Sequence, residues 1–190
     1  YLMLASAVNS LLGFIFWVIA ARLYSAEDVG LASALISAAS LLAVIASLGL
    51  GYGIIRFLTQ SGKNASSLIN SSLTLSGLAS IVVLLIFIGG LDFWAPALIW
   101  LRQNPAFLIV FIIFTAGFTL IILIGDSLVA KRQAGLNLAN SFIRGLLRLP
   151  LLIIPAVLSL HALGIFVSHT IALLTSLLVG IFLFLPRVQL

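Results

Sequence analysis

The chain has 190 residues, of which 63% are hydrophobic and only 7% are charged, and its mean hydropathy is +1.36. A soluble core of this size cannot enclose so much apolar surface, so lipid must be the solvent for most of the chain. The absence of cysteine excludes disulfides and thiolate sites, and nine Lys and Arg residues dispersed among hydrophobic segments do not form the continuous basic face that nucleic-acid binding requires.

Six stretches of the sequence are long enough and apolar enough to cross a bilayer, which takes roughly 20 residues of helix. No strand pattern competes with them, so the predicted fold class is all-α, a polytopic membrane protein with a single six-helix lobe over residues 1–190. The predicted helices cover residues 1–21, 28–52, 67–91, 106–130, 138–160 and 165–185. Because the chain opens and closes against apolar runs, with no initiator Met and no signal peptide, we expect a fragment of a longer protein.

The second predicted helix carries signals for its start and for its place in the bundle. Ser25 precedes Glu27 and Asp28, so it can cap a helix whose first turn holds carboxylates at the positive end of the helix dipole. Small residues follow on nearly every face of this helix and include Gly49 and Gly53. Small residues let membrane helices approach closely, so this helix is predicted to be central.

Later segments predict an interfacial loop and a bent helix. Trp94, Pro96 and Trp100 indicate that residues 92–105 form a loop in the headgroup region. Two prolines within residues 138–160 each remove a backbone donor, so the fifth helix should be kinked.

The distribution of cationic residues predicts the orientation. Those on one side of the membrane are Arg56, Lys63, Lys131, Arg132, Arg144, Arg148 and Arg187, whereas Arg22 and Arg102 fall on the other side. Cationic flanks are retained in the cytoplasm. Both ends of the segment are therefore predicted to be cytoplasmic, in a multi-pass protein of the cell membrane, with the loops after the first, third and fifth helices outside.

Four arginines are candidates for binding an anionic headgroup. Arg144 and Arg148 lie one helical turn apart near the start of the fifth predicted helix, so both project from the same face. They could hold a phosphate, or they could extend to the headgroups and only set the topology. Arg22 and Arg56 end the first two helices, where an inward guanidinium could grip a diphosphate bidentately. For Arg22 and Arg56, a structural role agrees with the sequence equally well.

Asp126 is the only acid that could reach membrane depth, which makes it a candidate for ion coupling. Pairing with Lys131 or Arg132, or exposure at the helix end, explains the same residue without transport, and this is the interpretation that we favour.

Other polar residues predict no enzymatic chemistry. Asn9, Asn70, Asn137 and Asn140 could hydrogen-bond sugar hydroxyls, although amides in membrane helices more often bind neighbouring helices. His161 and His169 are eight residues apart with no cysteine and no close carboxylate, so we expect no metal site and place both at the outer interface. The sequence contains no phosphate loop, paired carboxylates or serine elbow, and we expect neither an enzyme nor a cofactor.

The N-terminal third of the sequence carries a family resemblance. Residues 17–30 read WVIAARLYSAEDVG, and they are followed by SLGLG at 47–51 and IRF at 55–57. This pattern, strongest over residues 5–60, resembles polysaccharide biosynthesis membrane proteins, the oligosaccharide flippases of the multidrug/oligosaccharidyl-lipid/polysaccharide exporter superfamily.

The resemblance implies a transporter in which two six-helix lobes surround a central cavity and rock to expose it to each side in turn. This chain would be one lobe, and its partner would be a second lobe of the same chain or of another protomer. The implied substrate is an undecaprenyl- or dolichyl-diphosphate oligosaccharide, whose sugars cross in water while the tail stays in membrane lipid. Arg22 and Arg56 lie within the matched stretch, whereas Arg144 and Arg148 rest on chemistry alone.

The sequence leaves two other functions open. A multidrug or cation antiporter of the same superfamily would be expected to place several acids within its helices, and this chain offers only Asp126. A membrane assembly subunit that transports nothing would lack a face of convergent polar groups.

Overall fold

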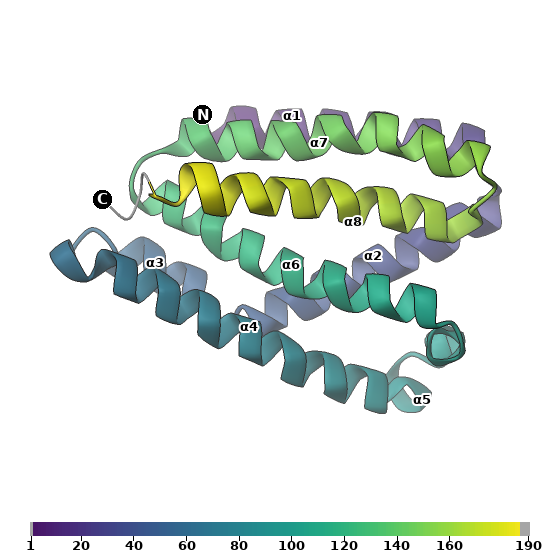
Figure 1. Cartoon of the computed structure of the whole chain (residues 1–190), viewed down its shortest axis with the longest axis horizontal. Helices are drawn as coiled ribbons and strands as arrows, with labels where there is room; N and C mark the ends of the chain where they lie inside the picture. The colour runs from purple at the N-terminus through teal and green to yellow at the C-terminus, as the bar shows by residue number, and fades with distance from the viewer. Residues whose placement is uncertain (1, 187–190) are drawn as a thin grey trace.

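The computed structural model describes residues 2–186, and in that range it contains helices and turns but no strand (Figure 1). Among these residues, six helices are long and apolar enough to cross a membrane, which confirms the all-α, polytopic fold class. They are α1 (Leu2–Leu23), α2 (Ala26–Ala46), α4 (Ala65–Gly89), α6 (Pro105–Ala130), α7 (Ala134–Val157) and α8 (His161–Val179), which continues as a π-helical turn, η3 (Gly180–Phe184). The shorter elements are α3 (Leu50–Phe57), η1 (Gly62–Asn64), α5 (Leu91–Trp94) and η2 (Pro96–Gln103).

The outer faces of the long helices are apolar. On α4, for example, Leu78 and Leu85 are 58% and 66% exposed, and on α1 Phe14 is 68% exposed. Soluble monomers rarely leave such surfaces open to water. These faces therefore match a bilayer, in agreement with the length and composition of the helices.

The prediction of one continuous helix over residues 28–52 is wrong. α2 ends at Ala46 and α3 begins at Leu50, because Leu48 and Gly49 both adopt left-handed backbone, with φ of 51° and 68°. Glycine reaches this conformation without a steric penalty and commonly ends helices. The Ser47 hydroxyl also donates to the carbonyl of Val44 over 2.7 Å, a local bond that competes with helix continuation.

The loop predicted for residues 92–105 consists mainly of two short helices, α5 and η2. Arg102 anchors them by pairing with Asp92 over 2.7 Å and by donating to the carbonyl oxygens of Ile88 and Gly89 at the end of α4. Helix ends leave carbonyls without a partner. The guanidinium supplies that partner, so this segment is held to the helix before it.

The fifth membrane helix begins earlier than predicted. α7 starts at Ala134 instead of residue 138, so Arg144 and Arg148 lie ten and fourteen residues into a helix of 24 residues. At about 1.5 Å per residue, Arg148 is roughly 21 Å along the axis. It therefore lies beyond the middle of the helix instead of near its start. Both prolines fall inside α7, as expected.

The helix with the most neighbouring helices is α6, whereas the small residues predicted a central place for α2. α6 packs against α2, α3, α4, α7 and α8, and in Figure 1 it crosses between the α7 and α8 pair and α4 on the opposite edge. Its Phe111 and Phe114 are fully buried, and the Phe114 ring lies 5.4 Å from that of Phe166 on α8. Large rings on α6 fill the centre, while α2, which is rich in small residues, packs against α1, α4, α6 and α8.

The turn between α1 and α2 is bound to the end of α7 and the start of α8. Ser25 caps α2, as predicted, by accepting from the backbone N–H of Asp28 over 3.1 Å. The Asp28 carboxylate accepts from the N–H of Ala162 on α8, and the Tyr24 hydroxyl donates to the carbonyl of Leu152. Burial, together with the charge of Asp28, raises the pKa of Tyr24, which keeps its hydroxyl a donor.

Helices α1 and α7 touch closely at Gly145. A Cβ at this position would lie 2.5 Å from Cδ1 of Leu12 and 3.2 Å from its Cβ. We expect Gly145→Ala to lower the free energy of unfolding by about 1–3 kcal/mol, because the added methyl overpacks this contact. Unfolding in mixed micelles of increasing SDS content measures the change.

The matched control is Gly135→Ala, on the same helix, where a Cβ would meet nothing within 4 Å. Equal stability of the two variants would contradict close α1–α7 packing at Gly145.

Candidate functional site

The arginine pair of α7 faces the interior of the bundle. Arg144 and Arg148 line a cavity of about 350 Å³ between α1, α6, α7 and α8. The rest of its wall is formed by Asn9, Gly13, Phe114, Phe118, Gly145, His169 and Leu173. Two cations on one helical face thus line the same cavity, as their one-turn spacing predicted.

Arg148 is held by an aromatic ring and has no anionic partner. Its guanidinium carbon lies 5.1 Å from the centroid of the buried Phe16 ring on α1, a cation–π arrangement. Its Nε atom is buried and has no hydrogen-bond partner. The ion pairs found in residues 2–186 are Arg102–Asp92 and the contact of His161 with Asp28, so neither arginine of the cavity is neutralised by a carboxylate there.

His169 lies in the same cavity, and its predicted place at the outer interface is wrong. It is the ninth residue of α8, and its ring packs against Phe16 and Phe114 with centroids 5.1 and 5.9 Å apart. Its Nδ1 atom is buried without a hydrogen-bond partner. The helical spacing of His169 from Ile165 and from Leu173, both buried, was the sequence signal for this inward face.

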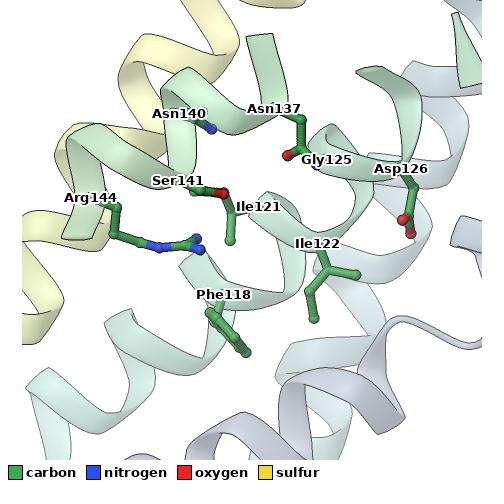
Figure 2. A pocket seen from close by; sticks show the side chains of 9 residues that line it. All are labelled: Phe118, Ile121, Ile122, Gly125, Asp126, Asn137, Asn140, Ser141 and Arg144. Carbon is green, nitrogen blue, oxygen red and sulfur yellow. The ribbon is translucent and has the colours of Figure 1, made fainter. Parts of the chain in front are cut away.

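A second cavity, of about 230 Å³, lies between α6 and α7 (Figure 2). Arg144 and Phe118 belong to its wall as well as to that of the first cavity. Figure 2 shows Arg144 reaching in from α7, Asn137 on the side of Gly125, and Asp126 on the far side of the view. Both apolar side chains, such as Ile121 and Ile122, and polar ones, such as Ser141, lie between the cation and the acid.

Asp126 also borders a third cavity, of about 400 Å³, between α2, α3 and α6. Its carboxylate lies against the backbone of α3, where a Cβ on Gly51 would come within 1.8 Å of Oδ2. Within the described part of the chain the carboxylate has no hydrogen bond and no ion pair. The favoured pairing with Lys131 or Arg132 is thus not present there.

The three cavities follow one another because each shares wall residues with the next. Phe118 belongs to all three, Arg144 to the first two, and Asp126 to the second and third. We call this series the polar groove. Arg148 and Arg144 lie toward one end of it and Asp126 toward the other, with polar and apolar side chains between them.

Arg22 and Arg56 are not part of the polar groove. Both are exposed, Arg22 at the end of α1 and Arg56 on α3, where its guanidinium lies 5.4 Å from the Phe57 ring centroid. Neither lines any of the three cavities. The structure therefore brings together three of the five candidates from the sequence, namely Arg144, Arg148 and Asp126.

The comparisons with known proteins identify no relative. No family model, no curated protein and no solved structure matches this chain. Residues 2–186 form an all-α structure with six helices that are long and apolar enough to cross a membrane. The polar groove is the feature of this structure that bears on function.

One asparagine that borders the groove has a structural role. Asn140 is 3% exposed, and its side-chain oxygen accepts a hydrogen bond of 2.9 Å from the Ser176 hydroxyl on α8. We expect Ser176→Ala to lower the free energy of unfolding by about 1–2 kcal/mol, because it leaves a buried amide oxygen without its donor. Thr175→Ala is the control, since its hydroxyl bonds only within α8. Unfolding by SDS titration compares the two, and an unchanged Ser176→Ala protein would contradict this role.

Proposed function

We propose that this chain is one six-helix lobe of a transporter that moves isoprenoid-diphosphate oligosaccharides across the cell membrane by alternating access. The observation that carries the proposal is the pair Arg144 and Arg148, which line one cavity and have no carboxylate partner in residues 2–186. Two guanidiniums on one face, in an interior without a counter-ion, are suited to an anionic ligand.

The chemistry of a diphosphate fits this pair. Residues one turn apart on a helix have Cβ atoms about 5–6 Å apart, a spacing at which two planar guanidinium forks can each bind one of two linked phosphates. Transfer of such a headgroup through hydrocarbon strips water from its charges at a cost of many kcal/mol. A hydrated cavity lined by cations reduces that cost, and a long isoprenoid tail can remain in lipid meanwhile.

The position of Arg148 weakens the alternative that it only sets topology. Arginines near helix ends extend to the headgroups, but Arg148 lies fourteen residues into α7 and its guanidinium is packed on Phe16. Charged residues at such depth usually face a bundle interior or a water-filled cavity and mark a transport path.

The polar groove also bears on the two competing functions. An assembly subunit without transport has no need of convergent unpaired polar groups, and here Asn9, Asn137 and both arginines border two adjacent cavities. A cation antiporter would need acids in its path, and Asp126 is the only acid in the groove. The balance of charge favours an anionic substrate.

We further propose that both ends of the segment face the cytoplasm and that a second lobe covers the groove. Arg56 and the α6–α7 turn with Lys131 and Arg132 lie at the end of the bundle where α1 begins. Arg22 and Arg102 lie at the opposite end, where Arg102 is neutralised by its pair. Arg187 of the predicted cationic side is outside the described residues.

Removal of both guanidiniums is the direct test of the function. We expect Arg144→Gln with Arg148→Gln to lower the rate at which the full-length protein flips a fluorescent isoprenoid-diphosphate glycolipid in proteoliposomes by at least about tenfold, equivalent to ~1.4 kcal/mol. Arg132→Gln, an exposed residue in the α6–α7 turn, is the matched control and should leave the rate unchanged. A folded double variant that flips the lipid at the original rate would refute the proposed function.

Cysteine labelling tests the orientation, and the chain offers no native cysteine as background. Gln60 and Gln103 are both exposed and lie at opposite ends of α4. We expect Gln103→Cys, but not Gln60→Cys, to react with a membrane-impermeant maleimide added to intact cells, because the cationic end is retained inside. The reverse pattern would invert the proposed orientation.

A further inference from the structure

We infer that Asp126 makes the polar groove selective for a diphosphate-linked sugar that is neutral or carries an amine, and against one that carries an acid. This rests on the proposed function and assigns a substrate class to the same site. Three features support it: the order of the groups along the groove, their lack of side-chain partners in the described residues, and the position of the carboxylate against α3.

The order of the groups matches a phosphate followed by a sugar. Arg144 belongs both to the cavity of the arginine pair and to the second cavity, which it shares with Asp126. The second cavity, of about 230 Å³, equals the liquid volume of roughly eight waters at ~30 Å³ each, which is the scale of one sugar ring. A phosphate bound by Arg144 would therefore place the attached sugar beside Asp126.

The groups that line the groove are available for a ligand. No hydrogen bond joins the side-chain amides of Asn9 and Asn137, or the carboxylate of Asp126, to a described residue. All three side chains are partly exposed and border the cavities, so a ligand can reach them. By contrast, Asn140, at the back of the groove, is satisfied by Ser176. Amides without partners in the middle of the groove can bond sugar hydroxyls, which both donate and accept.

The position of the Asp126 carboxylate depends on the absence of a side chain at residue 51. A Cβ there would lie 1.8 Å from Oδ2 and 2.9 Å from Cγ, so only glycine leaves this space open. The break between α2 and α3 brings Gly51 to this place, since α3 starts one residue earlier. The carboxylate is therefore held at the end of the groove and not in the α6–α7 turn with Lys131.

Charge then decides which sugar fits. A carboxylate on the sugar would face Asp126 inside the helix bundle, where like charges repel more strongly than in bulk water. An ammonium or hydroxyl group would instead donate to Asp126. Asp126 is thus a specificity residue, while the arginines supply the affinity for phosphate.

The test uses the full-length protein in phosphatidylcholine nanodiscs and the displacement of a fluorescent farnesyl diphosphate. The competing probes are inorganic pyrophosphate, glucose 1-phosphate, glucosamine 1-phosphate and glucuronic acid 1-phosphate. We expect glucuronic acid 1-phosphate to bind about tenfold more weakly than glucose 1-phosphate, and glucosamine 1-phosphate to bind most tightly. Asp126→Asn should reduce these differences to about twofold or less without weakening pyrophosphate binding.

Two further variants sharpen the result. Gly51→Ala keeps Asp126, but its added methyl group displaces the Asp126 carboxylate. This variant should therefore also reduce the discrimination among the sugar phosphates. Asp92→Asn removes an acid that is paired with Arg102 at the other end of α4, and it should leave the discrimination unchanged.

Failure of this inference differs from failure of the proposed function. Equal binding of the three sugar phosphates to the unaltered protein, or a discrimination that survives in Asp126→Asn, would refute selection by Asp126 while pyrophosphate still bound. If farnesyl diphosphate and pyrophosphate do not bind, or bind equally well after Arg144→Gln with Arg148→Gln, the proposed function falls and the inference with it.

Discussion

A guanidinium in the middle of a membrane helix imposes the main constraint on this structure. Charge at that depth is costly in hydrocarbon, so Arg144 and Arg148 require a cation–π partner, water or an anion. For Arg148 the bundle supplies the cation–π partner, which is Phe16. Water or an anion can enter the open cavity that both arginines line. The packing of α1, α6, α7 and α8 can therefore be understood as a wall around that cavity, with apolar faces turned outward to lipid.

Close packing and an open groove coexist on the same helices, and Gly145 and Phe114 contribute to both. Gly145 on α7 lets Leu12 of α1 approach the backbone, while Arg144 beside it in sequence lines the groove. On α6, Phe111 and Phe114 fill the core and Asp126 reaches the groove near the other end of the helix. Tight contacts hold the helices in place, and the polar side chains between them remain available.

The charged groups at the end of the bundle that holds the α1–α2 turn and η2 differ from those in the groove. Asp92 pairs with Arg102, which also covers the last carbonyls of α4, and Asp28 accepts a hydrogen bond from Ala162. These groups join helix ends and are satisfied by protein. Arg148 and Asp126 have no such protein partner in the described residues. This contrast separates groups that hold the fold from groups that can receive a ligand.

The sequence by itself determined the fold class, the approximate spans, the cap at Ser25 and the shared face of Arg144 and Arg148, because hydropathy, capping and helical periodicity are local properties. Only the tertiary structure decided the break at Leu48 and Gly49, the central place of α6, the inward position of His169 and the exclusion of Arg22 and Arg56 from the groove. These features depend on which helices meet and at what depth. Contacts between residues far apart in the chain set them, and no local pattern encodes such contacts.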